Sequence, residues 1–335
     1  MKKKATAPLT MRLTALLTAL FTALFALFAL FSVLPLTGCG EGDKSDSTPN
    51  YPVEVGGVRF VGAPSKVVCY SSTLIGIIYA MGYQNQLFGR TANCDYKEAE
   101  DLKACGTPDN PSVDLLVGNK VDLVIADDTI AAKAVKDIQE KEIPVVIIPR
   151  ATGRASMVEM YGALGACFKG GNTGYNKGCA IANDIFSQLD DISRLVEAEP
   201  PWNTCVIMSS DLNTFATGDT LVSTVLELAG GFNVARDSAK GEYALSDLMR
   251  SDPDVIIAPP GVEMRLRAKS SLVGIPALDN FRVYAMDMTV FDDQYQGVIK
   301  GAWRMAKILH PDIITDDIIP EGMIEPEEDE DVFID

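Results

Sequence analysis

The chain has 335 residues, and its 46 acidic side chains outnumber the 29 basic ones, which gives a net charge of −17 at pH 7. This acidity excludes nucleic acid as the main partner, and it excludes adsorption to anionic lipid through charge. The chain has one histidine, His310, so a metal site built from several histidines is also excluded, as is a histidine general base in a cleft.

Residues 1–38 have the pattern of a secretory signal. Four basic side chains precede an apolar run over residues 13–36, and the small residue Gly38 stands directly before Cys39. A cysteine at this place resembles the bacterial lipoprotein signal, which implies that Cys39 is lipidated. A plain membrane-spanning helix is the alternative, because the apolar run is long enough to cross a bilayer. We expect an extracytoplasmic protein anchored to the membrane by lipid, with residues 39–50 as a flexible tether.

The expected mature chain is more acidic than the full sequence. Cleavage after residue 38 leaves 297 residues and removes four basic side chains, so 25 basic and 46 acidic residues remain, with a net charge of −21. This length is typical of two domains, each with its own core. Residues 321–335 carry eight acids and no base. We therefore expect residues 319–335 to form an acidic, disordered tail.

Short apolar segments alternate with helical patterns along most of the mature chain. The expected strands are 66–70, 87–89, 123–126, 145–148, 204–208, 255–258 and 283–285. The expected helices include 74–81, 131–141, 156–167, 221–229 and 298–309. Strands that are apolar on both faces and separated by helices predict parallel sheets in an α/β fold.

One longer segment departs from this alternation. Between residues 178 and 196, apolar side chains recur at spacings of four, four, three and four, which is one face of a long amphipathic helix. Pro200 and Pro201 end it. The predicted fold is therefore α/β, with two doubly wound lobes of mostly parallel sheet joined by one long helix. The expected boundaries are 51–170 for the N-terminal lobe, 171–199 for the connecting helix and 200–318 for the C-terminal lobe.

The two halves of the chain repeat a pattern. Asp114 opens a short helical segment, and the apolar strand that starts at residue 123 follows Asp122. In the second half, Asp247 and Asp254 stand at the corresponding places. This repeat favours two lobes that arose by duplication.

Six cysteines follow the leader, and disulfides are permitted outside the cytoplasm. Two pairs each enclose a short polar loop, and we expect them to form disulfides: Cys94 with Cys105, and Cys167 with Cys179. Cys69 and Cys205 lie in apolar segments and are expected to be buried thiols. The chain has no C-x-x-C spacing, which argues against a zinc or thiol-redox site.

In open parallel sheets, ligands bind beyond the carboxyl ends of the strands. Applied to the expected strands, this rule selects Tyr70, Ser71, Arg90, Thr91, Asp127, Asp128 and Arg150 in the first lobe, and Ser209, Phe215, Phe291 and Tyr295 in or near the loops of the second. Aromatic rings offer flat area to a large ligand, and the arginines pair with carboxylates or a charged metal centre. Tyr70 is the leading candidate, followed by Arg90 and Arg150.

Several motifs resemble one known family. They are Pro64-Ser65-Lys66-Val67-Val68, Gly89-Arg90-Thr91 with Cys94-Asp95-Tyr96, Gly106-Thr107 through Asp114 to Asp122-Leu123-Val124-Ile125, Ala229-Gly230-Gly231-Phe232-Asn233-Val234, and Leu309-His310-Pro311. Over about residues 51–311 the chain is similar to the substrate-binding lipoproteins of ABC importers for iron-siderophores, haem and cobalamin. It departs from them at Lys97, where many members have proline.

The resemblance implies a binding protein that performs no chemistry and needs no cofactor. It would capture an iron-siderophore or haem-like metal chelate between two lobes that open and close only slightly, and it would act as a monomer that delivers the ligand to an ABC permease dimer. A cobalamin-type corrinoid is the alternative ligand. Asp114 and Asp247 occupy the positions where the family usually has glutamates that contact permease arginines.

Two functions of other classes are alternatives to transport. An extracytoplasmic hydrolase on an α/β scaffold would need a nucleophile elbow, and the chain has no G-x-S-x-G. A sensory or adhesive surface lipoprotein that kept the fold but lost transport is the other alternative.

Overall fold

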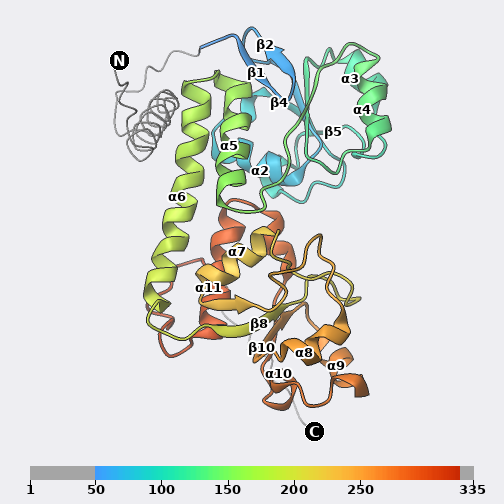
Figure 1. The fold of residues 1–335 in the computed structure, drawn as a ribbon. Helices are drawn as coiled ribbons and strands as arrows, with labels where there is room; N and C mark the ends of the chain where they lie inside the picture. Colours follow the sequence, from blue (N-terminus) through green and yellow to red (C-terminus); the bar gives the residue numbers. More distant parts are fainter. Residues whose placement is uncertain (1–49, 325–335) are drawn as a thin grey trace, which may run out of the picture. The chain divides into compact units, whose positions relative to one another are not determined.

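The computed structural model describes residues 50–324, which contain two parallel sheets and a long helix between them in the chain (Figure 1). The predicted fold class is confirmed. The leader, Cys39, the tether through residue 49 and the tail beyond residue 324 lie outside the described residues. Within the described part, no helix has the length and apolar character needed to cross a membrane.

The first sheet has five parallel strands in the order β5-β4-β3-β6-β7. The strands are β3 (Val67–Cys69), β4 (Leu87–Arg90), β5 (Lys103–Ala104), β6 (Leu123–Ala126) and β7 (Val145–Ile147), preceded by an antiparallel hairpin of β1 (Val53–Val55) and β2 (Val58–Phe60). Its helices are α2 (Ser72–Ala80), α3 (Val113–Gly118), α4 (Ala132–Gln139) and α5 (Arg154–Lys169). The two-residue strand β5 was not expected from the sequence because it is too short to produce a periodic pattern.

Side chains of the first sheet alternate between two hydrophobic clusters. Val67 and Cys69 join α2 and α5 in one cluster, whereas Val68 and Tyr70 point the opposite way and join α3 and α4 in another. Because successive residues of a strand face opposite sides, both faces of the sheet are buried. This alternation decides where Tyr70 lies.

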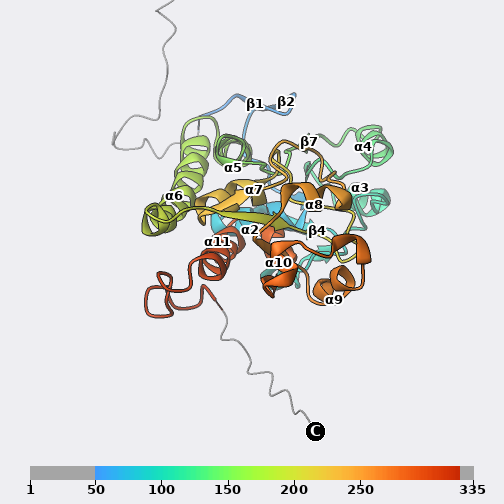
Figure 2. The same ribbon diagram turned by 60° about the horizontal axis from the view of Figure 1, so that its bottom comes forward.

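The second sheet has four parallel strands in the order β11-β10-β8-β9, surrounded by helices α7 to α11 (Figure 2). The strands are β8 (Trp202–Val206), β9 (Gly231–Asn233), β10 (Val255–Ala258) and β11 (Val283–Ala285). The helices are α7 (Leu221–Leu228), α8 (Leu248–Ser251), α9 (Val262–Arg267), α10 (Pro276–Asp279) and α11 (Gln296–Leu309), with the 3-10 helix η5 (Met288–Asp292) before α11.

The two sheets have matching topology. In the first sheet, β4 pairs with one edge of β3, and β6 and then β7 extend the sheet from its other edge. In the second sheet, β9 pairs with one edge of β8, and β10 and then β11 extend the sheet from its other edge. The backbone N–H of Asp122 donates to the carbonyl of Lys66 at 3.1 Å, and that of Asp254 donates to the carbonyl of Asn203 at 2.8 Å. Both aspartates therefore begin a strand beside the central one, which supports the duplication inferred from the sequence.

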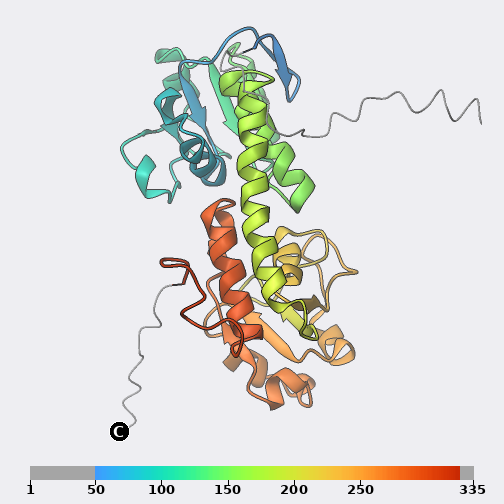
Figure 3. The same ribbon diagram turned by 90° about the vertical axis from the view of Figure 1, so that its left-hand side faces the viewer.

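The long helix α6 (Thr173–Val196) has 24 residues and runs past both lobes (Figure 3). It begins five residues before the apolar pattern, because its first turns pack on α5 through glycine instead of through large side chains. A Cβ atom built on Gly165 would lie 2.0 Å from the carbonyl oxygen of Gly174, and one built on Gly178 would lie 2.0 Å from that of Tyr161. The two helix backbones are thus in direct contact.

One hydrophobic cluster extends from the first lobe through α5, α6 and α11 into the second. Each sheet also has a core of its own on its other face. The described residues all belong to one compact unit. The lobes therefore share packing along the connecting helix in addition to the covalent link.

The cysteine predictions need correction. Cys94 and Cys105 are free thiols, and so is Cys167, so neither expected disulfide is present in the structure. The Sγ atom of Cys105 instead lies against Gly89, since a Cβ atom built on Gly89 would be 2.4 Å from this sulfur. Cys179 is buried on α6, with its thiol 3.8 Å from the carbonyl of Val158. The short polar loop between two cysteines shows only that they are close in the chain. It does not show whether their thiols point toward each other.

Candidate functional site

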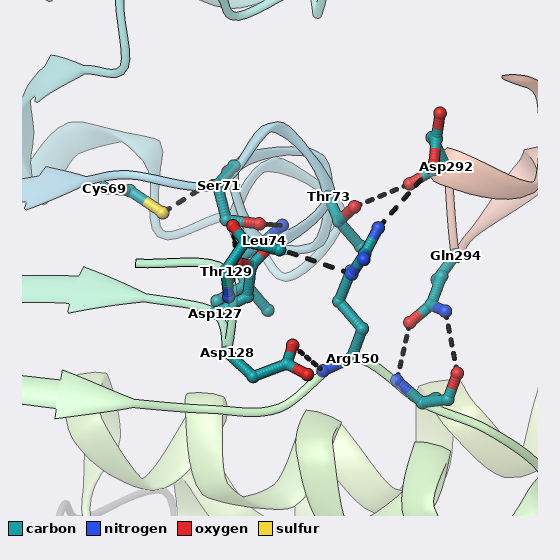
Figure 4. A network of polar contacts seen from close by, with 11 residues as sticks. Cys69, Ser71, Thr73, Leu74, Asp127, Asp128, Thr129, Arg150, Asp292 and Gln294 are labelled. Carbon is teal, nitrogen blue, oxygen red and sulfur yellow. Dashed lines mark hydrogen bonds and ion pairs between the residues drawn. The ribbon is translucent and has the colours of Figure 1, made fainter. Parts of the chain in front are cut away.

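Strands β3 and β6 lie side by side, and the chain leaves them in opposite directions, toward β4 and toward β7. Such a switch point is where open α/β sheets bind ligands. Ser71 follows β3 there, and Asp127 and Asp128 follow β6. Figure 4 shows these residues together with Arg150, which comes after β7.

Asp127 is 5% exposed and is held by its own loop. Its Oδ1 atom accepts hydrogen bonds from the backbone N–H of Thr129 at 2.9 Å and from the Thr129 hydroxyl at 2.5 Å. Its Oδ2 atom lies 4.0 Å from Nε of Arg150. This buried carboxylate is therefore paired within the first lobe.

Arg150 forms ion pairs with both lobes. Besides Asp127, its guanidinium lies 3.7 Å from a carboxylate oxygen of Asp292, which ends η5 in the second lobe. The backbone N–H of Arg150 donates to Oδ1 of Asp128 at 3.5 Å. The structure thus brings together two of the predicted residues, Asp128 and Arg150, with an acid of the second lobe that sequence reasoning missed.

More acids surround this ion pair. Burial raises the pKa of Asp292, Arg150 opposes this shift, and the negative charges of Asp95 and Asp287 reinforce it. Asp95 belongs to the first lobe and Asp287 to the second. The local potential is therefore negative, with carboxylates in excess over the arginine.

Tyr70 does not face the switch point. It is 1% exposed and lies in the cluster with α3 and α4, and its hydroxyl donates to the carbonyl of Cys105 at 2.6 Å. Burial raises the pKa of the hydroxyl, which keeps it protonated as a donor. The prediction that Tyr70 contacts a ligand is wrong for this structure, because the alternation of β3 places the ring on the opposite face.

Three other first-lobe candidates are engaged locally. Ser71 is the N-cap of α2, and its hydroxyl accepts from the backbone N–H of Leu74 at 3.3 Å. The guanidinium of Arg90 donates to the carbonyls of Thr91 at 3.0 Å and Glu100 at 3.3 Å. Thr91 is 2% exposed. These side chains shape the loops that follow β3 and β4.

The second-lobe candidates divide into loop and core residues. The hydroxyl of Ser209 donates to Asp211 at 2.5 Å and accepts from the N–H of Thr214 at 3.1 Å, so it stabilises the loop after β8. Phe215 is 1% exposed and Phe291 is 6% exposed, and both belong to hydrophobic clusters. The prediction that these two rings form a ligand platform is wrong, because aromatic residues in the loops complete the core instead.

Tyrosines that remain partly exposed lie near the junction of the lobes. Tyr295 is half-buried before α11, and the ring of Tyr96 lies 5.2 Å from that of Tyr79. Burial, together with nearby acids and tyrosines that include Tyr295, raises the pKa of Tyr96 to about 12. Tyr96 was part of a recognised motif, but its position became evident only in the structure.

The two acids of the repeated motif lie at the beginnings of short helices. Asp114 is exposed in the first turn of α3. Asp247 is partly buried before α8 and forms an ion pair with Arg250 at 3.1 Å. Both positions favour a negative charge through the helix dipole.

Two further features bear on ligand binding. Among residues 50–324, no group of three or more histidine, cysteine, aspartate or glutamate side chains is placed to hold a metal ion. A pocket of about 490 Å³ lies in the second lobe, lined in part by Trp202, Val255, Arg282 and His310. Trp202 and Val255 are the first residues of their strands, so this pocket lies at the opposite end of the sheet from the switch point.

Comparison with known proteins defines the class. A sequence model of the periplasmic binding protein family matches residues 67–289, so the chain belongs to this family, whose members are extracytoplasmic solute-binding proteins. An uncharacterised ABC transporter substrate-binding lipoprotein of Bacillus subtilis is 25% identical over 308 residues, covering 84% of this chain and 95% of its relative. A cobalamin-binding protein of Halobacterium salinarum is 23% identical over 266 residues, covering 74% of this chain and 70% of the relative.

The fold is also found in a solved structure. A possible iron-binding periplasmic solute-binding protein from Staphylococcus epidermidis superposes with a TM-score of 0.64 at 18% identity, covering 73% of this chain and 98% of that one. The predicted resemblance to ABC transporter substrate-binding proteins is confirmed. The identity of the ligand does not follow from a shared fold.

Proposed function

We propose that the protein is the lipid-anchored receptor of an ABC importer, which acts as a monomer, captures a metal-chelate-sized ligand between its lobes and delivers it to a permease dimer. The observation that carries the proposal is the family match over residues 67–289, which spans the switch points of both sheets. The anchor is supported by the signal that ends at Cys39 and by the relative that is named a lipoprotein.

Among chelates, the charges favour a neutral or cationic corrinoid over haem or an anionic ferric siderophore. The guanidinium of Arg90 already donates to backbone carbonyls, and that of Arg150 is already in ion pairs with Asp127 and Asp292. Asp128, Asp287 and Asp292 are exposed. Carboxylates near a ligand repel an anion and attract a cation. Tyr70, the leading candidate for a ligand contact, is buried and so is not placed to coordinate the iron of haem. The cobalamin-binding relative adds support to the corrinoid.

Titration with three probes tests the ligand class. We expect cyanocobalamin to quench the tryptophan fluorescence of the full-length protein in detergent with a dissociation constant of about 1 µM or lower, which corresponds to at least about 8 kcal/mol of binding free energy. Ferric enterobactin, which is anionic, and haemin should bind at least tenfold more weakly. Tighter binding of haemin or of the ferric siderophore would overturn the corrinoid assignment, and saturable binding of none of the three would contradict the whole proposal.

Permease docking is proposed for Asp114 and Asp247, one acid on each lobe. Replacing both by arginine should reduce ligand uptake by cells at least tenfold while ligand affinity of the purified protein stays within twofold, because such charges mainly steer encounter and register. Charge reversal of the exposed acids Glu140 and Asp237 serves as the matched control and should leave uptake unchanged. Normal uptake in the Asp114/Asp247 variant would show that the docking hypothesis for these two acids is wrong.

A further inference from the structure

Residues 292–294 of the second lobe form hydrogen bonds with three parts of the first lobe. Figure 4 shows two of these contacts, the one at Asp292 and the one at the side chain of Gln294. The hydroxyl of Thr73 on α2 donates to the carbonyl of Asp292 at 2.7 Å, and the hydroxyl of Tyr161 on α5 donates to the carbonyl of Gln294 at 2.8 Å. The third contact joins Gln294 to Ala151, between β7 and α5. One short segment is thus bound by two helices and a loop of the other lobe.

The side-chain amide of Gln294 pairs with the backbone of Ala151. The N–H of Ala151 donates to Oε1 of Gln294 at 2.8 Å, and Nε2 of Gln294 donates to the carbonyl of Ala151 at 2.9 Å. The side chain thus forms the same two hydrogen bonds with Ala151 as a residue of a neighbouring β-strand would. Gln294 is 6% exposed. Loss of the amide would leave two backbone groups unpaired away from water, which is costly. Only a side chain with one donor and one acceptor at this reach satisfies both.

The segment that carries Gln294 is held firmly to the second lobe. The carboxylate of Asp293 accepts hydrogen bonds from the N–H groups of Tyr295 at 3.0 Å and Gly297 at 2.9 Å, at the beginning of α11. A Cβ atom on Gly297 would lie 2.0 Å from the carbonyl of Val290, so η5 folds closely onto the helix. Any movement of α11 therefore displaces Gln294.

The place of this contact matters because the lobes have one long covalent connection, α6. A long helix bends and twists, so a helix alone leaves the angle between the lobes only loosely defined. A second point of attachment away from the helix axis removes much of this freedom. Ala151 and Gln294 are 143 residues apart in the chain and provide such a point.

We infer that Gln294 is a positioning residue that fixes the second lobe onto the first through the backbone of Ala151, and thereby sets the relative position of the loops at the two switch points. The ion pair between Arg150 and Asp292 lies beside this contact but has exposed partners, with side chains 41% and 62% accessible. Exposed pairs are screened by solvent and contribute little. Of these two neighbouring contacts, the buried amide pair is the one that fixes the position of the lobes.

The first test removes the amide and needs no ligand, so its outcome is independent of what the protein binds. In the full-length Gln294→Ala protein, the N–H of Ala151 should exchange with solvent deuterium at least tenfold faster than in the wild type. Spin labels on an encoded azide-bearing residue at the exposed positions Glu140 and Asp237 report the distance between the lobes. The width of the distance distribution should at least double. Arg150→Gln should change neither quantity.

A second variant separates the hydrogen bonds from packing. Gln294→Glu keeps the shape of the side chain, but at pH 8 it places a carboxylate oxygen with no hydrogen opposite the carbonyl of Ala151, so the contact should open. Near pH 5 the buried carboxyl is protonated and donates to this carbonyl, so the contact should form again. The ionisable side chains of Arg150, Asp292, Asp293, Tyr161 and Tyr295 also surround this position and are present in every variant. Gln296→Glu, an exposed change two residues away, therefore supplies the baseline and should show no such pH dependence.

Three results would overturn the assignment. A distance distribution in Gln294→Ala as narrow as in the wild type would show that α6 and the shared core alone position the lobes. A Gln294→Glu protein that stays loosened at pH 5 would show that packing, and not the paired hydrogen bonds, is responsible. Faster exchange at Ala151 with an unchanged distance distribution would also count against the proposal.

Discussion

Gly178→Ala is expected to lower the free energy of unfolding by at least about 3 kcal/mol, the upper part of the range for inserting a methyl group into a tightly packed site. The added Cβ would lie 2.0 Å from the carbonyl oxygen of Tyr161, which is backbone on the neighbouring helix and has no flexible end to move aside. The helices α5 and α6 would have to separate. Urea unfolding followed by circular dichroism measures the loss.

Gly118→Ala is the matched control for this change. Gly118 is the last residue of α3, and a Cβ atom there would meet nothing within 4 Å. Its replacement should change the free energy of unfolding by less than about 1 kcal/mol, in the stabilising direction expected for alanine in a helix. Equal effects of the two substitutions would contradict the close contact between α5 and α6.

Tyr70→Ala is expected to destabilise the protein by about 3–5 kcal/mol, as other truncations of large buried side chains do. Tyr70→Phe should cost about 1–2 kcal/mol, because it removes only the hydroxyl that donates to the carbonyl of Cys105 at 2.6 Å. Both values come from urea unfolding. The Phe variant stays folded, and its affinity for the corrinoid probe should equal that of the wild type. A tenfold loss of affinity at unchanged stability would return Tyr70 to the binding site.

The sequence predicted the strands more reliably than the positions of side chains around them. The expected strand at 123–126 coincides with β6, and the central part of the one at 66–70 forms β3. Strand β9 was missed because Gly231, Phe232 and Asn233 show no apolar run. The place of Tyr70 directly after β3 showed that it lies at the carboxyl end of the strand. The face of the sheet on which its ring lies depends on tertiary packing, which the local sequence does not show.

The candidate site was predicted in part. The rule for carboxyl ends of strands selected Asp128 and Arg150, which the structure brings together, because the rule depends only on strand direction. Their contact with a ligand stays a prediction. The rule also selected Phe215 and Phe291, which fold back into the core. Asp292 and Gln294 were missed, since their partners lie more than 100 residues away and nothing in their local sequence distinguishes them.

The sequence by itself determined the alternation of strands and helices, the long helix and the acidic charge, because apolar periodicity and composition are properties of short stretches of chain. The tertiary structure established that neither expected disulfide forms, that Tyr70 is buried and that Gln294 joins the lobes. These outcomes depend on the direction of each side chain and on packing between distant segments. A hydrogen bond across 143 residues forms only after the whole fold has brought its two groups together.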